Sequence, residues 1–147
     1  MELGLEMKIA FDLDGVLVPD YNRIPNLSEA EFFEQTLYAK PLFNPEGEFD
    51  VVTARLDYNR GVTEEWLSQL ITQPVRLLMR SSEDETPASF KYRMIKQHGY
   101  TLYVESDHAI CREIYEHSVA DGNDTLHVLH FDSFVSHIIT KGFRNKS

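Results

Sequence analysis

Short apolar runs alternate with amphipathic segments of helical spacing along the chain, and this alternation constrains the fold more than any other feature. The apolar runs predict five strands, at residues 7–11, 49–53, 75–79, 100–104 and 125–131. Strands that alternate with helices are typical of α/β proteins with a mainly parallel central sheet. In such a sheet, ligands bind at the carboxyl ends of the strands, where the strand order reverses.

Residues that favour helix starts and ends lie between the predicted strands. Ser and Thr are preferred N-terminal caps because their side-chain oxygens accept hydrogen bonds from free backbone N–H groups. The predicted caps are Ser28 (in a capping box with Glu31), Thr63 and Thr86 (which Pro87 follows), and Gly99 is the predicted end of the third helix. A fourth helix is predicted through Ile110 and Ile114.

Length, charge and cysteine content narrow the class of protein. A chain of 147 residues is the size of one domain and is long enough to bury a core without covalent staples. The formal net charge of −10, without a concentrated basic run, argues against binding to a nucleic-acid backbone. The single cysteine, Cys111, cannot form an internal disulfide and fits a reducing compartment. Without an apolar stretch of about 18 residues or a signal-peptide pattern, we expect a cytoplasmic protein that neither spans nor binds a membrane.

Asp12 and Asp14 follow the first predicted strand, within the stretch FDLDGVLV, and Gly15 allows a tight turn after them. Residues two apart in an extended segment point to the same side, so both carboxylates are expected to face one pocket. Neighbouring carboxylates repel each other unless they share a proton or a cation, and Mg²⁺ prefers oxygen ligands of this kind. Beside a metal, one carboxylate can attack phosphorus and form an aspartyl-phosphate. The other can protonate the leaving oxygen and later activate water.

Two further strands bring polar groups to the same edge of the sheet. Thr53 ends the second predicted strand, and Glu105 ends the fourth. Because the carboxyl ends of parallel strands meet at one edge, we expect both side chains to lie near Asp12. The histidines give no comparable signal, because the spacing of His127 and His130 predicts opposite faces of a strand and argues against a shared metal site.

The stretch FDLDGVLV resembles the first motif of the haloacid dehalogenase superfamily, phosphatases and phosphotransferases with an aspartate nucleophile. That family continues with a Thr or Ser after an apolar strand, then a Lys, then an acidic cluster after a further strand. VVTAR supplies Thr53, SFKYR supplies Lys91, and LYVESD supplies Glu105 and Asp107, in the same order and over nearly the whole chain. The resemblance implies one domain, residues 1–147, folded as a three-layer sandwich around a Rossmann-like sheet.

The resemblance also implies roles for individual residues. Asp12 is the expected nucleophile, and Asp14 is the expected general acid and base, with its backbone carbonyl also on Mg²⁺. Thr53 is expected to bind the phosphoryl oxygens, and Lys91 to neutralise charge on the nucleophile and the phosphate. The expected metal ligands are Asp12, Asp14, Glu105 and Asp107. The implied activity is Mg²⁺-dependent hydrolysis of a phosphomonoester.

The fourth motif departs from the family's common forms, which are two adjacent aspartates or Gly-Asp followed by a second aspartate. The chain has ESD at residues 105–107. Glu105 is favoured as the metal ligand because it lies at the strand end, with Asp107 as the alternative. Asp107 also occupies the position of a helix N-cap, and both of its roles are open. Lys96 competes with Lys91 for the position of the family's lysine.

Substrate size is suggested by what lies between the motifs. Arg55 follows Thr53 closely and is a candidate for binding an anionic substrate. The family often inserts a cap domain between motifs, but the segments 15–52 and 54–90 are each just under 40 residues and leave no room for one. We therefore expect an open site for a phosphorylated small molecule or nucleic-acid end, or a site closed by a second copy in a homo-oligomer. The part from VTAR to FKY is similar to the phosphatase module of polynucleotide kinase-type proteins.

Two other functions are compatible with the sequence. The irregular ESD motif suits a catalytically silent module of the same fold that binds a phosphorylated ligand or a protein partner. A phosphoacceptor domain of the receiver kind also gathers carboxylates, a Thr and a Lys around Mg²⁺, but its phosphorylated Asp follows the third strand. In this chain the acidic residues after that strand come several residues too late.

Overall fold

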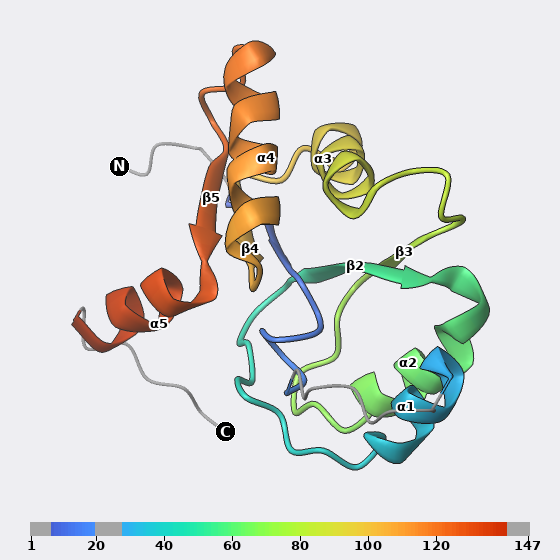
Figure 1. The fold of residues 1–147 in the computed structure, drawn as a ribbon. Coiled ribbons are helices and arrows are strands. Elements are labelled where there is room, and N and C mark those ends of the chain that lie inside the picture. Colours follow the sequence, from blue (N-terminus) through green and yellow to red (C-terminus); the bar gives the residue numbers. More distant parts are fainter. Residues whose placement is uncertain (1–6, 20–27, 141–147) are drawn as a thin grey trace.

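The centre of the fold is a sheet of parallel strands (Figure 1). The computed structural model describes residues 7–19 and 28–140. Within these residues the strands are β1 (Ile9–Phe11), β2 (Asp50–Leu56), β3 (Leu77–Arg80), β4 (Leu102–Glu105) and β5 (His127–His130). Their order in the sheet is β3-β2-β1-β4-β5, and all neighbouring pairs are parallel. The predicted α/β class and parallel sheet are confirmed.

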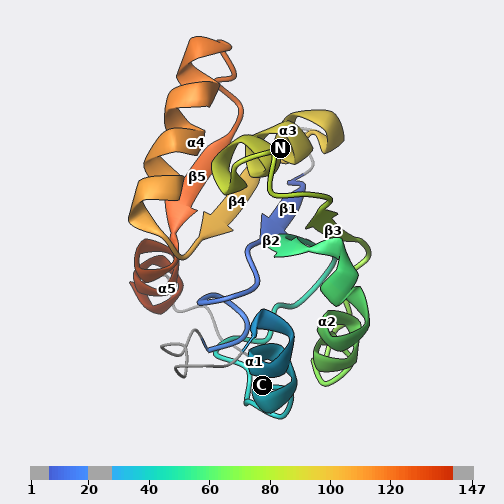
Figure 2. The ribbon, with the colours of Figure 1, turned by 45° about the vertical axis from the view of Figure 1, so that its right-hand side comes forward.

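Helices cover both faces of the sheet, which gives three layers (Figures 1 and 2). One face carries α3 (Pro87–His98) and α4 (His108–Ala120), and the other carries α1 (Glu29–Gln35), α2 (Arg60–Leu67) and α5 (Phe131–Thr140). A short 3-10 turn, η1 (Asp57–Asn59), leads into α2. Among the described helices, none combines the length and the apolar character that crossing a membrane requires.

The alternation of side chains along the strands divides the core into two clusters, one on each face of the sheet. In β1, Phe11 packs on one face and Ala10 on the other. The first cluster includes Phe11, Leu13, Val51, Trp66, Leu67 and Val104, and the second includes Ala10, Val52, Phe90, Ile95, Tyr103 and Ile114. Because the central strands pack on both sides, the polar residues that follow them are held in defined positions.

The helix ends predicted for α1 and α3 are confirmed. Ser28 Oγ accepts a hydrogen bond from the backbone N–H of Glu31, while the Glu31 carboxylate accepts one from the backbone N–H of Ser28. Thr86 Oγ1 accepts a hydrogen bond from the backbone N–H of Ser89 at the start of α3. At the other end of α3, Gly99 adopts a φ of 72°, a left-handed conformation that favours glycine.

Two predicted boundaries in the second βα unit are wrong. β2 continues to Leu56, past its predicted end at Thr53, with a change of register to β3 between these two residues. Thr63 does not cap α2 but lies inside it, and its hydroxyl donates to the carbonyl of Asn59 one turn earlier. The helix starts at Arg60 because η1 winds directly into it, without a side-chain cap that a sequence pattern could reveal.

Helix α5 is absent from the sequence prediction. The apolar run at residues 125–131 predicts one strand, whereas β5 ends at His130 and Phe131 begins α5. Hydrophobic periodicity alone cannot divide a short apolar run into strand and helix when no turn residue separates them.

The strand order reverses next to β1. The chain passes from β1 to β2 and β3 on one side, and then crosses back to β4 on the other side of β1. In open α/β sheets, ligands bind outside the carboxyl ends of the strands at such a reversal, which here lies between β1 and β4. Phe11 lies opposite Val104, and the backbone N–H of Asp12 donates to the Val104 carbonyl at 2.9 Å. Asp12, directly after β1, and Glu105, the last residue of β4, are therefore neighbours at this edge of the sheet.

Candidate functional site

A tight turn follows β1, and Asp12 and Asp14 lie in it, at the carboxyl edge of the sheet. Gly15 has a φ of 84°, which a residue with a Cβ rarely adopts. The backbone N–H groups of residues 16–18 all donate to the carbonyl of Leu13, at 2.9 to 3.3 Å. Residues 16–18 are themselves buried in the core, so the turn is anchored on its far side.

Asp12 lies at the centre of the site and contacts three segments of the chain. Its Oδ1 accepts hydrogen bonds from the Leu13 backbone N–H at 2.8 Å and from Lys91 Nζ at 3.2 Å, and its Oδ2 lies 2.9 Å from Ser106 Oγ. Burial raises the pKa of Asp12 to about 7, Lys91 opposes this rise, and the charge of Glu105 adds to it. The three hydrogen bonds thus fix the orientation of the Asp12 carboxyl, while the positive charge of Lys91 offsets only part of the cost of ionising it.

Lys91, on α3, joins Asp12 to a second buried carboxylate. Lys91 Nζ lies 2.8 Å from Glu105 Oε1, and the Lys91 side chain is only 3% exposed. Burial alone would lower the pKa of Lys91, but the charges of Asp12 and Glu105 outweigh burial and raise it. Lys91 therefore lies beside Asp12, the expected nucleophile, as the motif order predicts. The competing residue, Lys96, is exposed and pairs with Asp121 at 3.0 Å.

The two acidic residues of the ESD motif have different roles. Glu105 Oε1 accepts hydrogen bonds from Lys91 Nζ and from the Tyr103 hydroxyl, and Glu105 Oε2 accepts one from the Asp107 backbone N–H. Glu105 is 1% exposed, and through these hydrogen bonds it holds Lys91 beside Asp12. Its expected contact with a metal stays a prediction. Asp107 is exposed and caps α4 by accepting from the Ile110 backbone N–H at 3.0 Å, which confirms the N-cap role.

Ser106 is the site residue that the sequence reasoning missed. Ser106 Oγ lies 2.9 Å from Asp12 Oδ2 and 2.8 Å from the backbone carbonyl oxygen of Asp14. From its place directly after β4, the Ser106 hydroxyl thus links the Asp12 side chain to the Asp14 backbone. A signal was available, because Ser106 follows the last residue of that strand directly, but the acidic residues on both sides are the more familiar metal ligands.

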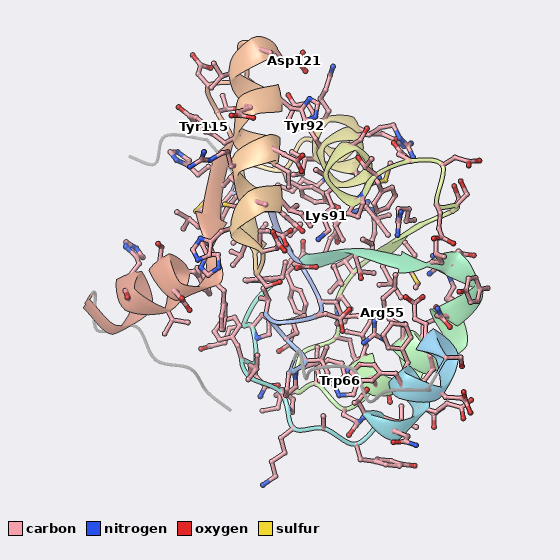
Figure 3. All side chains as sticks on the ribbon, viewed as in Figure 1. Arg55, Trp66, Lys91, Tyr92, Tyr115 and Asp121 are labelled. Atoms are coloured by element: carbon pink, nitrogen blue, oxygen red, sulfur yellow. The ribbon has the colours of Figure 1, made fainter. Side chains whose placement is uncertain are left out.

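Arg55 faces the interior of the protein and holds Asp14. Its Nε and Nη2 donate to the two carboxylate oxygens of Asp14, at 3.0 and 2.7 Å, and its Nη1 donates to Thr63 Oγ1 at 3.0 Å. The guanidinium also lies over the Phe33 ring, 3.8 Å from its centroid. In Figure 3, Arg55 and Lys91 lie on opposite sides of the β2 ribbon. These contacts orient Asp14, and the substrate contact expected of Arg55 stays a prediction.

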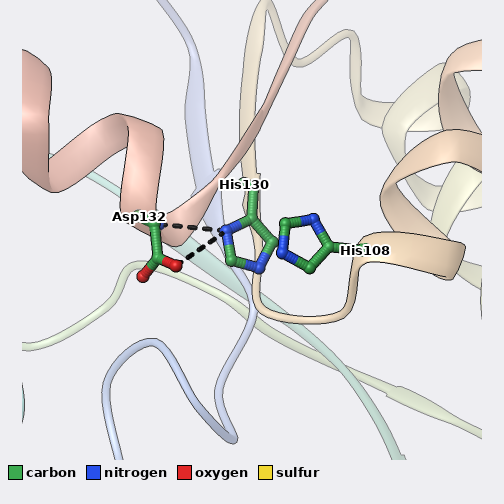
Figure 4. A group of neighbouring side chains, drawn as sticks. All are labelled: His108, His130 and Asp132. Atoms are coloured by element: carbon green, nitrogen blue, oxygen red, sulfur yellow. Dashed lines mark hydrogen bonds and ion pairs between the residues drawn. The ribbon is translucent and has the colours of Figure 1, made fainter.

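A second polar cluster is formed by His108, His130 and Asp132 (Figure 4), and it contacts Ser106 through His130. Nitrogen and oxygen atoms of the three side chains lie within 4.8 Å of one another, a spacing that a metal site requires. His130 Nε2 donates to the Ser106 carbonyl at 2.8 Å, however, and His130 Nδ1 accepts from the Asp132 backbone N–H at 3.1 Å. The His108 ring stacks on the His130 ring with 3.6 Å between centroids, so their lone pairs lie in parallel planes and do not converge. The cluster therefore acts as a support for the turn at Ser106.

Hydrogen bonds through Lys91 join Asp12 and Glu105, and Ser106 joins Asp12 to the backbone of Asp14. Thr53 lies inside β2, three residues before its end. Thr53 is 1% exposed, and its Oγ1 accepts a hydrogen bond from the Arg55 backbone N–H at 3.1 Å. No protein-family model, curated protein or solved structure matches the chain.

Proposed function

We propose that the chain is a Mg²⁺-dependent phosphohydrolase that removes phosphate from a phosphomonoester through an aspartyl-phosphate on Asp12. The observation that carries this proposal is the buried Asp12 carboxylate at the reversal of strand order, held between Lys91 and Ser106. A carboxylate in this position is oriented before substrate arrives, which lowers the entropic cost of attack. The resemblance of FDLDGVLV to haloacid dehalogenase phosphatases supports the same chemistry.

The donor atoms around Asp12 fit Mg²⁺. Asp12 Oδ2 and the carbonyl oxygen of Asp14 both lie within hydrogen-bond distance of one hydroxyl, so two hard oxygen ligands converge. The carboxylates of Asp12 and Glu105 share one ammonium, that of Lys91, which leaves negative charge for a divalent cation to balance. Asp12 and Asp14 would hold the ion, which when bound neutralises charge on the phosphoryl oxygens.

Asp12 and Asp14 share the reaction between them. In the first step, an Asp12 carboxylate oxygen bonds to phosphorus, and the bond from phosphorus to the leaving oxygen breaks. Asp14, in its protonated form, gives its proton to that oxygen and is left as the carboxylate that Arg55 holds. In the second step, water attacks phosphorus and gives a proton to Asp14, and the bond between phosphorus and Asp12 breaks to release inorganic phosphate. Lys91 offsets negative charge on Asp12 and on the phosphoryl group throughout.

The chain's net charge bears on the class of substrate, and its single cysteine bears on the cellular compartment. A phosphorylated small molecule or a phosphorylated nucleic-acid end is the proposed substrate, and the net charge of −10 favours the small molecule. The lone cysteine, Cys111, supports a cytoplasmic location.

The test is release of inorganic phosphate from a panel of sugar phosphates, nucleotides and 3′- or 5′-phosphorylated oligonucleotides, with Mg²⁺ and with EDTA. Asp12→Asn should lower the turnover of any substrate by about 10³-fold or more, because it removes the nucleophile and keeps the shape of the side chain. Asp57→Asn is the matched control, an exposed carboxylate beyond the same edge of the sheet, and should leave turnover unchanged. Absence of Mg²⁺-dependent phosphate release across the whole panel would contradict the proposal.

A catalytically silent phosphate-binding module is the second candidate. It is favoured by the burial of the reactive groups, since the side chains of Asp12 and Lys91 are 6% and 3% exposed. Saturable binding of Mg²⁺ and inorganic phosphate without turnover of any substrate would support this alternative, and efficient turnover would exclude it.

A further inference from the structure

We propose that the hydroxyl oxygen of Ser106 is the third protein ligand of the Mg²⁺ site, in the place where the sequence leads one to expect Glu105 or Asp107. The inference rests on the proposed function for the presence of Mg²⁺, and it names the residue that sets the affinity for the ion. The observation that carries it is the triangle of oxygens formed by Ser106 Oγ, Asp12 Oδ2 and the carbonyl oxygen of Asp14.

The two sides of this triangle that meet at Ser106 have the length of an edge of an octahedral site. Ser106 Oγ lies 2.9 Å from Asp12 Oδ2 and 2.8 Å from the Asp14 carbonyl oxygen. Adjacent ligands of Mg²⁺, each about 2.0 to 2.1 Å from the ion at right angles, lie about 2.9 Å apart. Ser106 Oγ therefore has the spacing from both other oxygens that two adjacent ligands of the ion require.

The hydrogen-bond capacity of Ser106 points to the same conclusion. A serine hydroxyl carries one proton, and Ser106 Oγ lies at hydrogen-bond distance from two oxygens, one of Asp12 and the carbonyl of Asp14. When Asp12 is ionised, both of these oxygens can only accept, and one of the two contacts lacks a proton. A cation at the centre of the triangle would satisfy all three oxygens together.

The acidic neighbours of Ser106 are committed elsewhere. Glu105 accepts three hydrogen bonds, including one from Lys91, and moving it to a metal would leave the buried ammonium with Asp12 as its partner. Asp107 accepts from the first turn of α4 as its N-cap. Ser106 is the residue of the three whose side chain lies within hydrogen-bond distance of both Asp12 Oδ2 and the Asp14 carbonyl oxygen.

The backbone of Ser106 is held so that its hydroxyl keeps this direction. The Ser106 carbonyl accepts from His130 Nε2 at 2.8 Å, and His130 is fixed in turn by Asp132 and by stacking on His108 (Figure 4). Residues outside the coordination sphere that orient a ligand in this way are typical of metal sites. The histidine cluster thereby gains a role in the site without binding the ion itself.

A neutral ligand in this position has a measurable consequence. Affinity for hard cations rises with the number of charged ligands, so a site completed by a hydroxyl binds Mg²⁺ more weakly than one completed by a carboxylate. Ser106→Ala should weaken Mg²⁺ binding further, because the remaining ligands are Asp12 Oδ2 and the Asp14 carbonyl. Ser106→Asp should strengthen it, and it should also destabilise the metal-free protein by placing a third carboxylate beside Asp12 and Glu105.

The experiment measures metal binding directly on the full chain, by calorimetric titration with Mg²⁺ and by loss of the free Mn²⁺ electron paramagnetic resonance signal. We expect the dissociation constant to rise about tenfold in Ser106→Ala and to fall about tenfold in Ser106→Asp. Asp107→Asn is the matched control, because asparagine also caps helices well, and its dissociation constant should equal that of the wild type. Thermal unfolding with EDTA verifies that each variant is folded.

The outcomes separate this inference from the proposed function. Equal Mg²⁺ affinity in the wild type and both Ser106 variants, or a loss of affinity in Asp107→Asn alone, overturns the assignment of Ser106, even if phosphate release depends on Mg²⁺. The expected changes in affinity without phosphate release from any substrate uphold Ser106 as a ligand and overturn the hydrolase. Absence of saturable Mg²⁺ binding in the wild type overturns both.

Discussion

At the scale of single residues, the geometry of the site depends on the ion pair between the Arg55 guanidinium and the Asp14 carboxylate. The guanidinium donates to both carboxylate oxygens and to Thr63, and the Arg55 side chain is 5% exposed. A planar guanidinium holds a carboxylate in one orientation through two parallel hydrogen bonds, which a lysine ammonium cannot reproduce. In the proposed reaction, Asp14 gives a proton to the leaving oxygen and takes one from water, so the rate should depend on the orientation of its carboxylate.

Arg55→Lys should therefore lower kcat for phosphate release more than it changes KM, because Asp14 loses its orientation while the remaining contacts persist. The variant should also lower the free energy of unfolding by about 1 to 3 kcal/mol, since Thr63 and one oxygen of Asp14 lose a donor. Urea denaturation and steady-state kinetics measure the two effects. Arg60→Lys is the control, an exposed pair with Asp57 that should change neither quantity appreciably. A wild-type kcat in Arg55→Lys would show that Asp14 is oriented by other means.

At the scale of elements, α3 is the helix that delivers Lys91 to the site. Both ends of α3 are defined by local chemistry, with Thr86 capping its first turn and Gly99 ending it. Buried residues along α3, including Phe90 and Ile95, pack against the sheet on the face opposite to α2. The position of Lys91 is therefore set by helix packing and helix capping together.

Thr86→Ala should lower the free energy of unfolding by about 1 kcal/mol, because the backbone N–H of Ser89 loses its acceptor. Thr86→Ser keeps the oxygen and should remain within a few tenths of the wild type. Urea denaturation of the three proteins in parallel measures the difference. If Thr86→Ala and Thr86→Ser were equally stable, the cap would contribute nothing to α3.

At the scale of the whole molecule, α5 completes the core on one face of the sheet. Phe134 on α5 packs against Phe11 of β1 and against Phe43, with ring centroids 5.5 and 5.3 Å apart. Phe11 also contacts Phe49, so one aromatic cluster joins the first strand, a loop and the last described helix. Aromatic pairs at these distances stabilise a core beyond the area that they bury. We infer that α5 is an integral part of the helical layer that it forms with α1 and α2.

Phe134→Ala should lower the free energy of unfolding by about 2 kcal/mol, less than for a fully buried phenylalanine because Phe134 is only half-buried. Val119→Ala, at an exposed position of α4, is the control and should stay within about 0.5 kcal/mol of the wild type. Chemical denaturation measures both values. A change in Phe134→Ala as small as that of the control would mean that α5 adds little to the core.

The sequence by itself determined the class of fold and placed Asp12 after the first strand. The alternation of apolar runs and helical patterns predicted the parallel sheet, and the caps at Ser28 and Thr86 predicted two helix starts, because these signals act between residues close together in the chain. The place of Asp12 directly after the first strand also followed from the strand pattern, and the place of Lys91 beside it followed from motif order. Boundaries without a local cap, such as the start of α2 and the junction of β5 with α5, did not.

Only the tertiary structure decided which polar groups meet. Arg55 is 41 residues from Asp14 in the chain, and Ser106 is 94 residues from Asp12, so no local pattern could show that they are hydrogen-bonded. The same is true of Glu105, whose role depends on whether Lys91 or solvent lies beside it in the folded chain. A buried polar side chain takes the partner that packing brings within reach, because leaving it without one costs more free energy than almost any local preference can supply.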